Sequence, residues 1–339
     1  MQAKQETENR YRLGACLPVF GSCADRYCLS GYGRGASTLE GMLDLAAQCP
    51  GLQGVELVGN WHIHDDNIGS MPKELSDRGL AACMLTADLW TQAKWARGSL
   101  AAPDAPTRAA AVAECRKVIE WAEAMGNVFV DLWFGQDGYD YPFQSDYESA
   151  WQWLVEGVGA AAAHRPNVPV CIEYKLKEPR THIHVNSAAK TLLLIDAVGA
   201  GNLGALLDTG HALAAGENAA EAAALLHGNG RKRLFYVHLN DNYGLWDDDM
   251  IVGSVRVIEL MEFLYWLRRL DYRGWLTLDV FPYREEGLAA ARESFAWIAD
   301  LLRIIEEARP EEIERVLQAG DGAESVRLAR RLLTGGNQT

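Results

Sequence analysis

The 339-residue sequence lacks several features that would assign it to a membrane, secreted or nucleic-acid-binding class. It has no run of about 18 apolar residues, which a membrane-spanning helix needs. Its start, MQAKQETENRYR, is polar and has no hydrophobic segment of the kind that secretory signals contain. Acidic residues outnumber lysine and arginine by 46 to 32, and the net charge of −14 argues against nucleic-acid phosphates as the main ligand. We therefore expect neither a membrane nor a nucleic acid as a partner.

Cysteine is also scarce, and it has no framework spacing. The seven cysteines are an odd number and are scattered along the chain. Such a distribution is typical of free thiols in a reducing compartment, so we expect a cytoplasmic protein without disulfides.

The chain does contain a repeated pattern of short apolar runs followed by longer segments with helical periodicity. The predicted strands are 12–19, 54–58, 81–85, 128–132, 170–174, 203–207, 234–239 and 275–280. The predicted helices begin near residue 38 and then span 107–125, 146–163, 187–198, 217–226, 255–270 and 288–308. Eight strand–helix units in about 300 residues predict an α/β protein with a (β/α)₈ TIM barrel. A doubly wound open sheet is the alternative, but the GYGRG sequence at 31–35 is not the phosphate-binding fingerprint of that fold.

Beyond the barrel, the sequence predicts further helices. We expect residues 1–308 to form the barrel and residues 309–339 to form a C-terminal helical extension and tail, with one or two helices in 310–333 and a frayed end from 335.

Four successive predicted strands each end in a side chain that can bind a metal. These are Glu173, Asp208, His238 and Asp279. In a TIM barrel the C-terminal ends of the strands converge on one site. Carboxylates with one imidazole suit Mg²⁺ or Mn²⁺ better than a thiolate-bound zinc. Lys175 follows Glu173 by two residues and points to the same face of the strand, although an exposed ion pair is the simpler interpretation of this pair alone.

A second acidic cluster follows the seventh predicted strand. Asp247 and Asp249 belong to the sequence WDDDM, and His211 lies just beyond Asp208 in what we expect to be a loop. The cluster could be a solvated acidic loop. Alternatively, these residues could hold a second cation with Asp208 as the bridge, because two metals about 3.5–4 Å apart form a known clamp for substrate oxygens.

Candidate substrate contacts lie after the second, third and fourth predicted strands. His64 is followed by acidic residues and is a candidate for acting on a sugar ring oxygen. Trp90, Trp95 and Trp133 follow strands, as does Phe134. Aromatic residues are most often part of a hydrophobic core, but several at strand ends can form the wall of a carbohydrate pocket.

Taken together, the motifs resemble the xylose isomerase-like TIM barrel family, with a pattern closest to that of xylose isomerases and L-rhamnose isomerases. The resemblance covers roughly residues 12–283. It rests on HDDN at 64–67, LWFGQDGYD at 132–140, EYKLKEPR at 173–180, LDTGHA at 207–212, HLND at 238–241, WDDDM at 246–250 and LDVFP at 278–282.

The resemblance implies a role for each matching residue. The first metal would be held by Glu173, Asp208, His238 and Asp279, and the second by Asp208, His211, Asp247 and Asp249. Lys175 would hydrogen-bond the substrate carbonyl oxygen, and His64 would assist ring opening. Trp133 would shield the reacting carbons from water, with Trp95 completing that wall and His211 also facing the substrate.

Two residues depart from the xylose isomerase pattern. His238 stands where xylose isomerases have Asp, as in the rhamnose type. Asn67 stands where xylose isomerases have an Asp that pairs with the catalytic histidine, which weakens the case for His64. The chain is also shorter at its C-terminus, which puts the tail-swapped tetramer of those enzymes in doubt.

The resemblance implies a metal-dependent aldose–ketose isomerase that acts on a small unphosphorylated monosaccharide by a hydride shift. Two Mn²⁺ or Mg²⁺ ions are expected, with Co²⁺ also possible. We also expect a homo-oligomer, either a dimer or a tetramer. Asp247 and Asp249 would activate a metal-bound water as the base.

The first alternative is a ketose 3-epimerase, or a dehydratase or lyase of a keto-sugar or inositol derivative, on the same barrel. A DNA-repair nuclease and a non-catalytic scaffold or sugar-binding subunit are further alternatives; the acidic charge opposes the nuclease, and the set of ligand-type residues opposes the scaffold.

Overall fold

Eight parallel strands form a closed barrel in the computed structural model, which describes residues 10–335. Around the barrel the strands follow the order β1-β10-β9-β8-β6-β4-β3-β2. They are β1 (Arg12–Cys16), β2 (Gly54–Val58), β3 (Ala81–Thr86), β4 (Phe129–Trp133), β6 (Val170–Glu173), β8 (Leu203–Asp208), β9 (Leu234–Leu239) and β10 (Trp275–Leu278). The predicted TIM barrel is confirmed.

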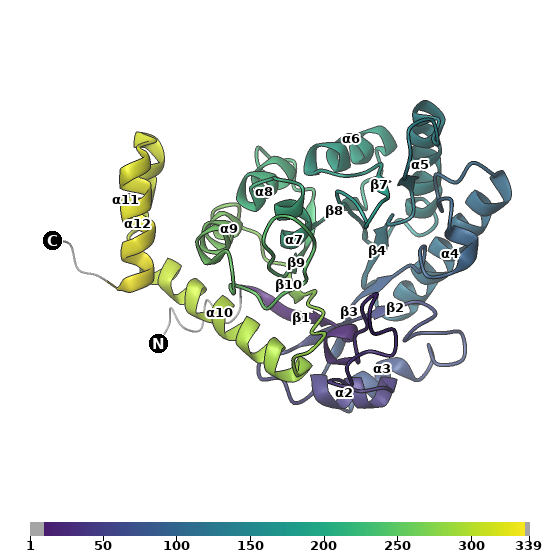
Figure 1. Cartoon of the computed structure of the whole chain (residues 1–339), viewed down its shortest axis with the longest axis horizontal. Coiled ribbons are helices and arrows are strands. Elements are labelled where there is room, and N and C mark those ends of the chain that lie inside the picture. The colour runs from purple at the N-terminus through teal and green to yellow at the C-terminus, as the bar shows by residue number, and fades with distance from the viewer. Residues whose placement is uncertain (1–9, 336–339) are drawn as a thin grey trace.

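Helices surround the barrel, as Figure 1 shows. Several begin at a side-chain cap, because an Asp, Ser, Thr or Asn accepts a hydrogen bond from a free backbone N–H of the first turn, as Asp146 does before α5 and Ser187 before α6. The helices are α2 (Leu39–Ala46), α3 (Met71–Ser76), α4 (Ala105–Ala124), α5 (Tyr147–Ala162), α6 (Ala188–Val198), α7 (Thr209–Ala214), α8 (Ala219–His227), α9 (Val257–Arg269) and α10 (Gly287–Glu307).

Two further helices follow the barrel, α11 (Pro310–Ala319) and α12 (Gly322–Thr334). They stand apart from the ring of helices at the far end of α10 (Figure 1). Gly320 ends α11 with a φ of 62°, a left-handed conformation that glycine adopts without strain. The tail expected after residue 335 lies outside the described residues, as do the first nine residues.

The first strand is shorter than predicted. We expected it to extend to residue 19, but β1 ends at Cys16 and a short 3₁₀ helix, Leu17–Phe20, follows. Pro18 accounts for the difference, because proline has no N–H to donate to a neighbouring strand. The short helices α3 and α7 were not predicted, and neither was a small antiparallel pair, β5 (Gly138–Tyr139) with β7 (His182–Ile183).

Side chains fill the barrel below its C-terminal end. A separate buried cluster inside the barrel consists of Cys83, Met84, Cys171, Leu206, Tyr236 and Trp275. The guanidinium of Arg12 lies over the Trp275 ring at 4.4 Å. Because this packing occupies the interior, side chains of the chemical site have room only toward the C-terminal ends of the strands.

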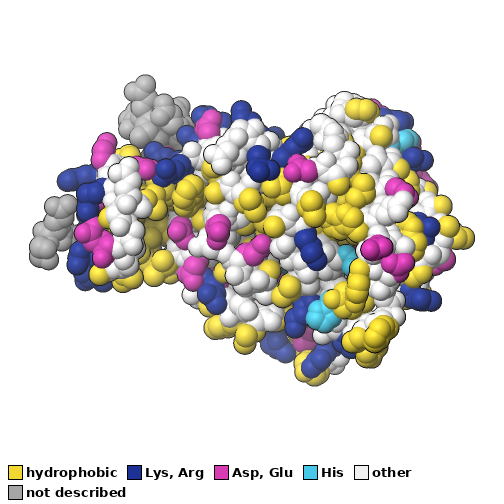
Figure 2. All heavy atoms as spheres, turned by 90° about the horizontal axis from the view of Figure 1, so that it is seen from above, with side chains coloured by type: hydrophobic (Ala, Val, Ile, Leu, Met, Phe, Trp, Pro, Cys, Tyr) yellow, Lys and Arg dark blue, Asp and Glu magenta, His cyan; other side chains and the backbone are white. Residues whose placement is uncertain are grey.

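The seven cysteines are all unpaired, as expected. Within residues 10–335, no helix combines the length and the hydrophobicity that crossing a bilayer requires. On the face seen in Figure 2, basic and acidic side chains are interspersed and are not gathered by sign.

Candidate metal centre and sugar pocket

Four side chains meet at the C-terminal end of the barrel, and we call them the first donor group: Glu173, Asp208, His238 and Asp279. Glu173 and Asp208 are the last residues of β6 and β8, Asp208 pairs with His238 across β8 and β9, and Asp279 directly follows β10. One ligand atom from each lies within 4.8 Å of the others. Nδ1 of His238 is 3.2 Å from an oxygen of Glu173 and 3.8 Å from an oxygen of Asp208 and of Asp279. The structure thus brings together the four residues that the resemblance implies for one metal.

The electrostatics of the first donor group favour a cation. Burial raises the pKa of Asp208 above its usual value, and it raises the pKa of Asp279 to about 7 against the opposing charge of His238. Burial would also raise the pKa of Glu173, but the charge of His238 holds it below the usual range. Carboxyl groups packed this closely repel one another when ionised, and a divalent cation would offset that repulsion. An oxygen-rich set with one imidazole fits Mg²⁺ or Mn²⁺.

A second donor group consists of Asp208, His211 and Asp247, whose ligand atoms also lie within 4.8 Å of one another. His211 lies on α7, not in a loop as expected, because Asp208 caps this helix and accepts a hydrogen bond of 2.8 Å from the backbone N–H of His211. Nε2 of His211 is 3.0 Å from Oδ2 of Asp247, and its Nδ1 is 2.9 Å from the carbonyl oxygen of Tyr174.

One atom of the second donor group, Oδ1 of Asp247, is buried and has no hydrogen-bond partner among the described residues. A buried carboxylate oxygen without a partner carries a substantial free-energy cost. A cation at this group would supply the missing interaction.

Lys175 lies beside the second donor group. Its Nζ is 2.9 Å from Oδ2 of Asp247 and 2.7 Å from Oε1 of Glu178, and it lies 5.2 Å from the centre of the Trp133 ring. Burial disfavours the charged amine, but Asp247 and Glu178 together hold the pKa of Lys175 well above its usual value. The ammonium group is therefore fixed and charged at the wall of the site.

Asp249 lines the same cavity but is not one of the three side chains of the second donor group. Its backbone has a φ of 48°, and its carbonyl oxygen accepts a hydrogen bond of 3.0 Å from Phe281. Burial, with the charge of Asp247 adding to it, raises the pKa of Asp249 well above its usual range. Asp249 therefore lies beside the second donor group but is not part of it in this structure.

Apart from the fully buried Asp208, the side chains of both donor groups line a cavity of about 300 Å³, which we call the inner cavity. Three indole rings form a continuous wall: Trp61 and Trp90 have ring centres 5.9 Å apart, and Trp90 and Trp133 have ring centres 4.9 Å apart. Further aromatic side chains line the cavity, namely Trp246, Phe281 and Tyr283. Its volume is at the lower end of the range for small-molecule sites.

Two of the predicted substrate contacts lie elsewhere. His64 is exposed, is not among the residues that line the inner cavity, and uses its backbone N–H to bind the side chain of Asn67. Trp95 is fully buried, and its indole N–H donates a 3.1 Å hydrogen bond to the carbonyl oxygen of Asp88. Neither side chain is placed by this structure to touch a ligand in the inner cavity.

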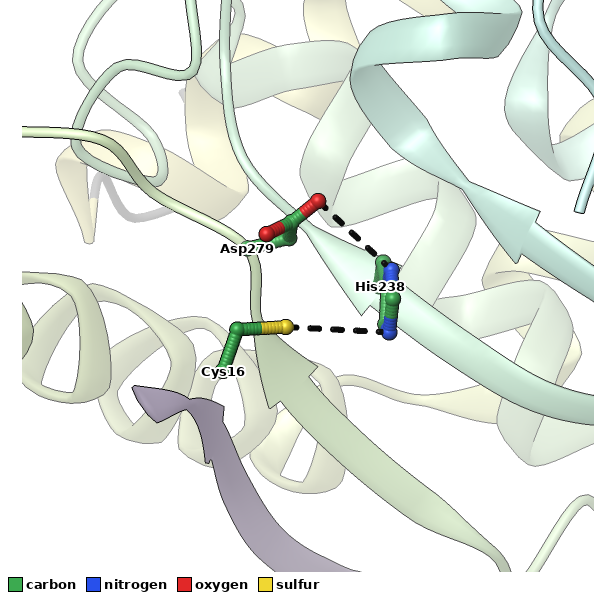
Figure 3. A group of neighbouring side chains, drawn as sticks. All are labelled: Cys16, His238 and Asp279. Atoms are coloured by element: carbon green, nitrogen blue, oxygen red, sulfur yellow. Dashed lines mark hydrogen bonds and ion pairs between the residues drawn. The ribbon is translucent and has the colours of Figure 1, made fainter. Parts of the chain in front are cut away.

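Glu56, near the end of β2, is a site residue that the sequence analysis missed. Its two oxygens lie 3.0 and 3.1 Å from Nε2 of His238, and the thiol of Cys16 donates a 3.2 Å hydrogen bond to one of them. Figure 3 shows the His238 ring between Cys16 and Asp279. Glu56 therefore binds the nitrogen of His238 that faces away from Glu173, which leaves Nδ1 directed at the first donor group.

Asp131 in β4 was missed as well. It is 1% exposed, its Oδ1 has no hydrogen-bond partner among the described residues, and it lines the inner cavity. Burial, followed by the charge of Glu173, raises its pKa well above the usual value. For both residues, the sequence contains a signal that could have found them: each is a single acidic residue in an otherwise apolar strand, Asp131 in FVDLW and Glu56 in GVELV.

The fold is a β/α barrel, and two buried groups of carboxylate and imidazole donors lie at the C-terminal ends of its strands. These features define a class of protein, TIM barrels with a candidate divalent-metal centre at the end where the active sites of this fold lie. Within that class, the chain belongs to the xylose isomerase-like TIM barrel family, whose model matches residues 43–301. The resemblance seen in the sequence is confirmed at this level.

Curated relatives are distant. A xylose isomerase from Thermus thermophilus is 25% identical over 235 residues, which are 67% of this chain and 60% of that protein. A xylose isomerase from Bacillus subtilis is 26% identical over 154 residues, which are 44% of this chain and 35% of that protein. The chain thus spans between about a third and 60% of the length of these relatives.

Solved structures with other names share the fold over more of the chain. A crystal structure of a D-tagatose 3-epimerase-like protein has a TM-score of 0.67 at 18% identity and covers 88% of this chain and 99% of its own. A structure of L-ribulose 3-epimerase has a TM-score of 0.66 with the same identity and coverage. At this identity the similarity shows a common fold.

Proposed function

We propose that this chain is a divalent-metal-dependent enzyme that rearranges a free, unphosphorylated sugar at carbons next to its carbonyl group. The observation that carries the proposal is the first donor group, whose four ligand atoms lie within 4.8 Å of one another and of which Glu173, His238 and Asp279 line the inner cavity. The indole wall supports a sugar as the substrate, because the C–H faces of a sugar ring pack against aromatic rings. Its hydroxyl groups need polar partners, which the carboxylates and Lys175 supply.

The first donor group would hold one Mg²⁺ or Mn²⁺ ion, which, when bound, polarises hydroxyl and carbonyl oxygens of the sugar. The chain's own residues would do the rest. Lys175, charged and fixed by Asp247, would donate a hydrogen bond to the oxygen on which negative charge develops. Trp133 would exclude water from the reacting carbons.

Epimerisation of a ketose at C3 is the first candidate reaction. Two of the similar solved structures, each covered over 99% of its length, are named as a 3-epimerase-like protein and a 3-epimerase, and a third is named as a xylose isomerase domain protein. In addition, Glu173 and Asp279 approach the site from β6 and β10, which β8 and β9 separate in the barrel. A sugar carbon bound between the two carboxylates would have one on each side, so one could remove a proton and the other return it to the opposite face.

Aldose–ketose isomerisation is the second candidate, favoured by the second donor group. Asp208, His211 and Asp247 lie next to Lys175 with Asp249 close by, and Asp247 Oδ1 has no partner among the described residues. A second cation at this group is needed for a hydride shift between C1 and C2 by the mechanism that the family resemblance implies. A proton-transfer epimerase needs only one.

The test uses the full chain after chelation and dialysis, reloaded with Mn²⁺, Mg²⁺ or Co²⁺ and offered a panel of ketoses and aldoses in D₂O. The epimerase proposal expects C3 epimers with one solvent deuterium at C3. The isomerase proposal expects an aldose–ketose pair that retains the substrate's hydrogen. Full activity of the metal-free protein, or no rearrangement of any sugar with any metal, would refute metal-dependent sugar rearrangement.

A further inference from the structure

A larger cavity lies directly beside the inner cavity. This outer cavity has a volume of about 660 Å³, about twice that of the inner one. Three residues line both cavities, Trp90, Trp133 and Glu178. These three side chains lie between the two cavities, so a ligand that reached from the donor groups into the outer cavity would pass beside them.

One wall of the outer cavity is fixed by Asp137, which is completely buried. Its carboxylate accepts hydrogen bonds of 2.7 Å from the backbone N–H groups of Ser99 and Ala101, and another from the Ser99 hydroxyl. Its carbonyl oxygen accepts one of 2.9 Å from the N–H of His184. Asp137 thus ties the loop after β3 to the segment after β7.

The pair β5–β7 and the turn that follows β5 continue this wall from Asp137. The Thr181 hydroxyl donates a 2.7 Å hydrogen bond to Asp140, and the side-chain oxygen of Gln144 accepts bonds of 2.7 and 2.8 Å from the backbone N–H groups of Asp140 and Tyr141. These contacts hold the cavity open in one shape. Such a preformed cavity binds a ligand without the cost of ordering loops.

The lining combines aromatic rings with uncharged hydrogen-bonding groups. Tyr139 and Trp153 add two rings to those of Trp90 and Trp133, and the neutral polar groups include Gln136, Gln144, Ser145 and Thr181. The side-chain nitrogen of Gln144 has no hydrogen-bond partner among the described residues, so it is available to a hydroxyl group. Rings that pack on C–H faces, next to amide and hydroxyl groups, match the chemistry of a sugar.

The charges on the lining do not suit a phosphate or another anion. Arg97 and Arg180 are the two basic side chains that line the outer cavity, and both are exposed. Arg180 pairs with Asp140 at 3.4 Å, and Asp146 and Glu178 add two more carboxylates. A neutral ligand is favoured over an anion in such surroundings.

We propose that the outer cavity is a subsite for a second, neutral sugar ring, and that the protein prefers a glycosylated ketose to a free monosaccharide. The identity of the inner ring as a ketose rests on the proposed function. Binding of the second ring does not, because the donor groups line the inner cavity and are separate from the outer one.

Calorimetric titration tests the subsite on the full chain, both metal-free and loaded with Mn²⁺. The probes are D-fructose, isomaltulose (fructose with glucose on O6) and lactulose (fructose with galactose on O4). At least one disaccharide is expected to bind about tenfold more tightly than fructose in both forms, as one or two aromatic contacts would provide. If neither disaccharide binds more tightly than fructose, the subsite proposal is wrong.

Variants locate the second ring. Tyr139→Ala and, separately, Trp153→Leu are expected to reduce the ratio of disaccharide to fructose affinity several-fold. Tyr141→Ala is the matched control, because Tyr141 is 60% exposed and does not line the outer cavity. A ratio unchanged in both test variants, with thermal unfolding showing that they are folded, would overturn the assignment. Tight disaccharide binding upholds the subsite whether or not any sugar is rearranged, so the failure of the proposed reaction can be told apart from the failure of the subsite.

Discussion

A carboxylate oxygen of Glu56 lies 3.0 Å from Nε2 of His238, on the side of the imidazole away from Glu173. An acceptor at Nε2 places the ring proton there and leaves Nδ1 unprotonated to bind a metal. Glu56→Gln is therefore expected to lower metal affinity by about 10- to 100-fold, the usual effect of removing such a partner.

Calorimetric titration with Mn²⁺ measures this change. Glu114→Gln is the matched control, because Glu114 is also a buried glutamate but accepts a hydrogen bond from Asn60 instead of contacting a donor group. Equal affinity for Mn²⁺ in wild type and Glu56→Gln would contradict the role of Glu56.

Lys175 and Glu173 are two residues apart in sequence but have separable roles in the proposal. Lys175→Met should keep the metal of the first donor group, which Lys175 does not contact, and lose turnover by about 100-fold or more, because the hydrogen bond to the developing oxyanion is removed. Glu173→Gln should lose both metal and turnover. Metal content by mass spectrometry and initial rates distinguish the two variants, with Lys73→Met, an exposed lysine on α3, as the control. Normal turnover in Lys175→Met would remove this residue from the mechanism.

The sequence predicted the barrel well because its signals are local. Short apolar runs mark the strands, and an acidic or histidine residue at a run's end, as at Asp208, marks the side where the ends converge. Positions between the strands and the long helices were harder to predict. His64 lies in an irregular segment and Trp95 in a three-residue 3₁₀ helix, and neither segment has a periodic pattern that shows which side chains face the site. The outer cavity depends on bonds between separate loops, which no spacing in the sequence reveals.

Glu56 and Asp131 are a different case, because their signal was present in the sequence. Each is a single acidic residue within an apolar strand, two residues before the end of that strand. They were missed because only the residue at the end of each predicted strand was considered as a site residue. His211 was placed in a loop because a six-residue helix directly after a strand leaves little periodicity to detect.

The metal-free protein should lose stability as the pH rises from 7 to 8.5. Burial opposes the charge on His211, but Asp208 and Asp247 raise its pKa to about 10, so the folded state keeps a proton that the unfolded state releases near pH 6.5. The stabilisation is therefore complete below pH 6.5 and is lost toward pH 10; between pH 7 and pH 8.5 the loss is on the order of 2 kcal/mol. His62 and His184, whose pKa values burial lowers to about 4, do not titrate here.

Thermal unfolding at pH 7.0 and 8.5 measures the effect. Mn²⁺ should reverse the trend, because metal binding requires a neutral imidazole and ionised carboxylates. His211→Gln should weaken the pH dependence of the metal-free protein but not abolish it, because burial opposes the charge on His238 but Glu56 raises its pKa well above its usual value. A metal-free wild type that is more stable at pH 8.5 than at pH 7.0 would contradict this account.

Gly210 allows α7 to approach β9 closely. A Cβ at this position would overlap the side-chain oxygen of Asn240 and lie 2.8 Å from Oδ1 of Asp247. Because Asn240 donates hydrogen bonds of 3.0 and 3.1 Å to Asp208, Gly210→Ala should displace a side chain that orients both donor groups. We expect a loss of about 1–3 kcal/mol in stability and weaker metal binding.

Gly201→Ala is the control for this substitution, because a Cβ there meets nothing within 4 Å. Chemical denaturation gives the free energy of unfolding of each variant. If Gly210→Ala is as stable as Gly201→Ala and binds Mn²⁺ equally well, the close approach has no bearing on the site.

The wall formed by Trp61, Trp90 and Trp133 has a spectroscopic consequence. Three indole rings held at fixed angles of 61° and 81° to their neighbours should give a near-ultraviolet circular dichroism signal that depends on their mutual orientation. Trp90 and Trp133 line both cavities, so a ligand in either one is expected to change this signal. The proposed binding of sugars can therefore be screened by circular dichroism without a label and without turnover.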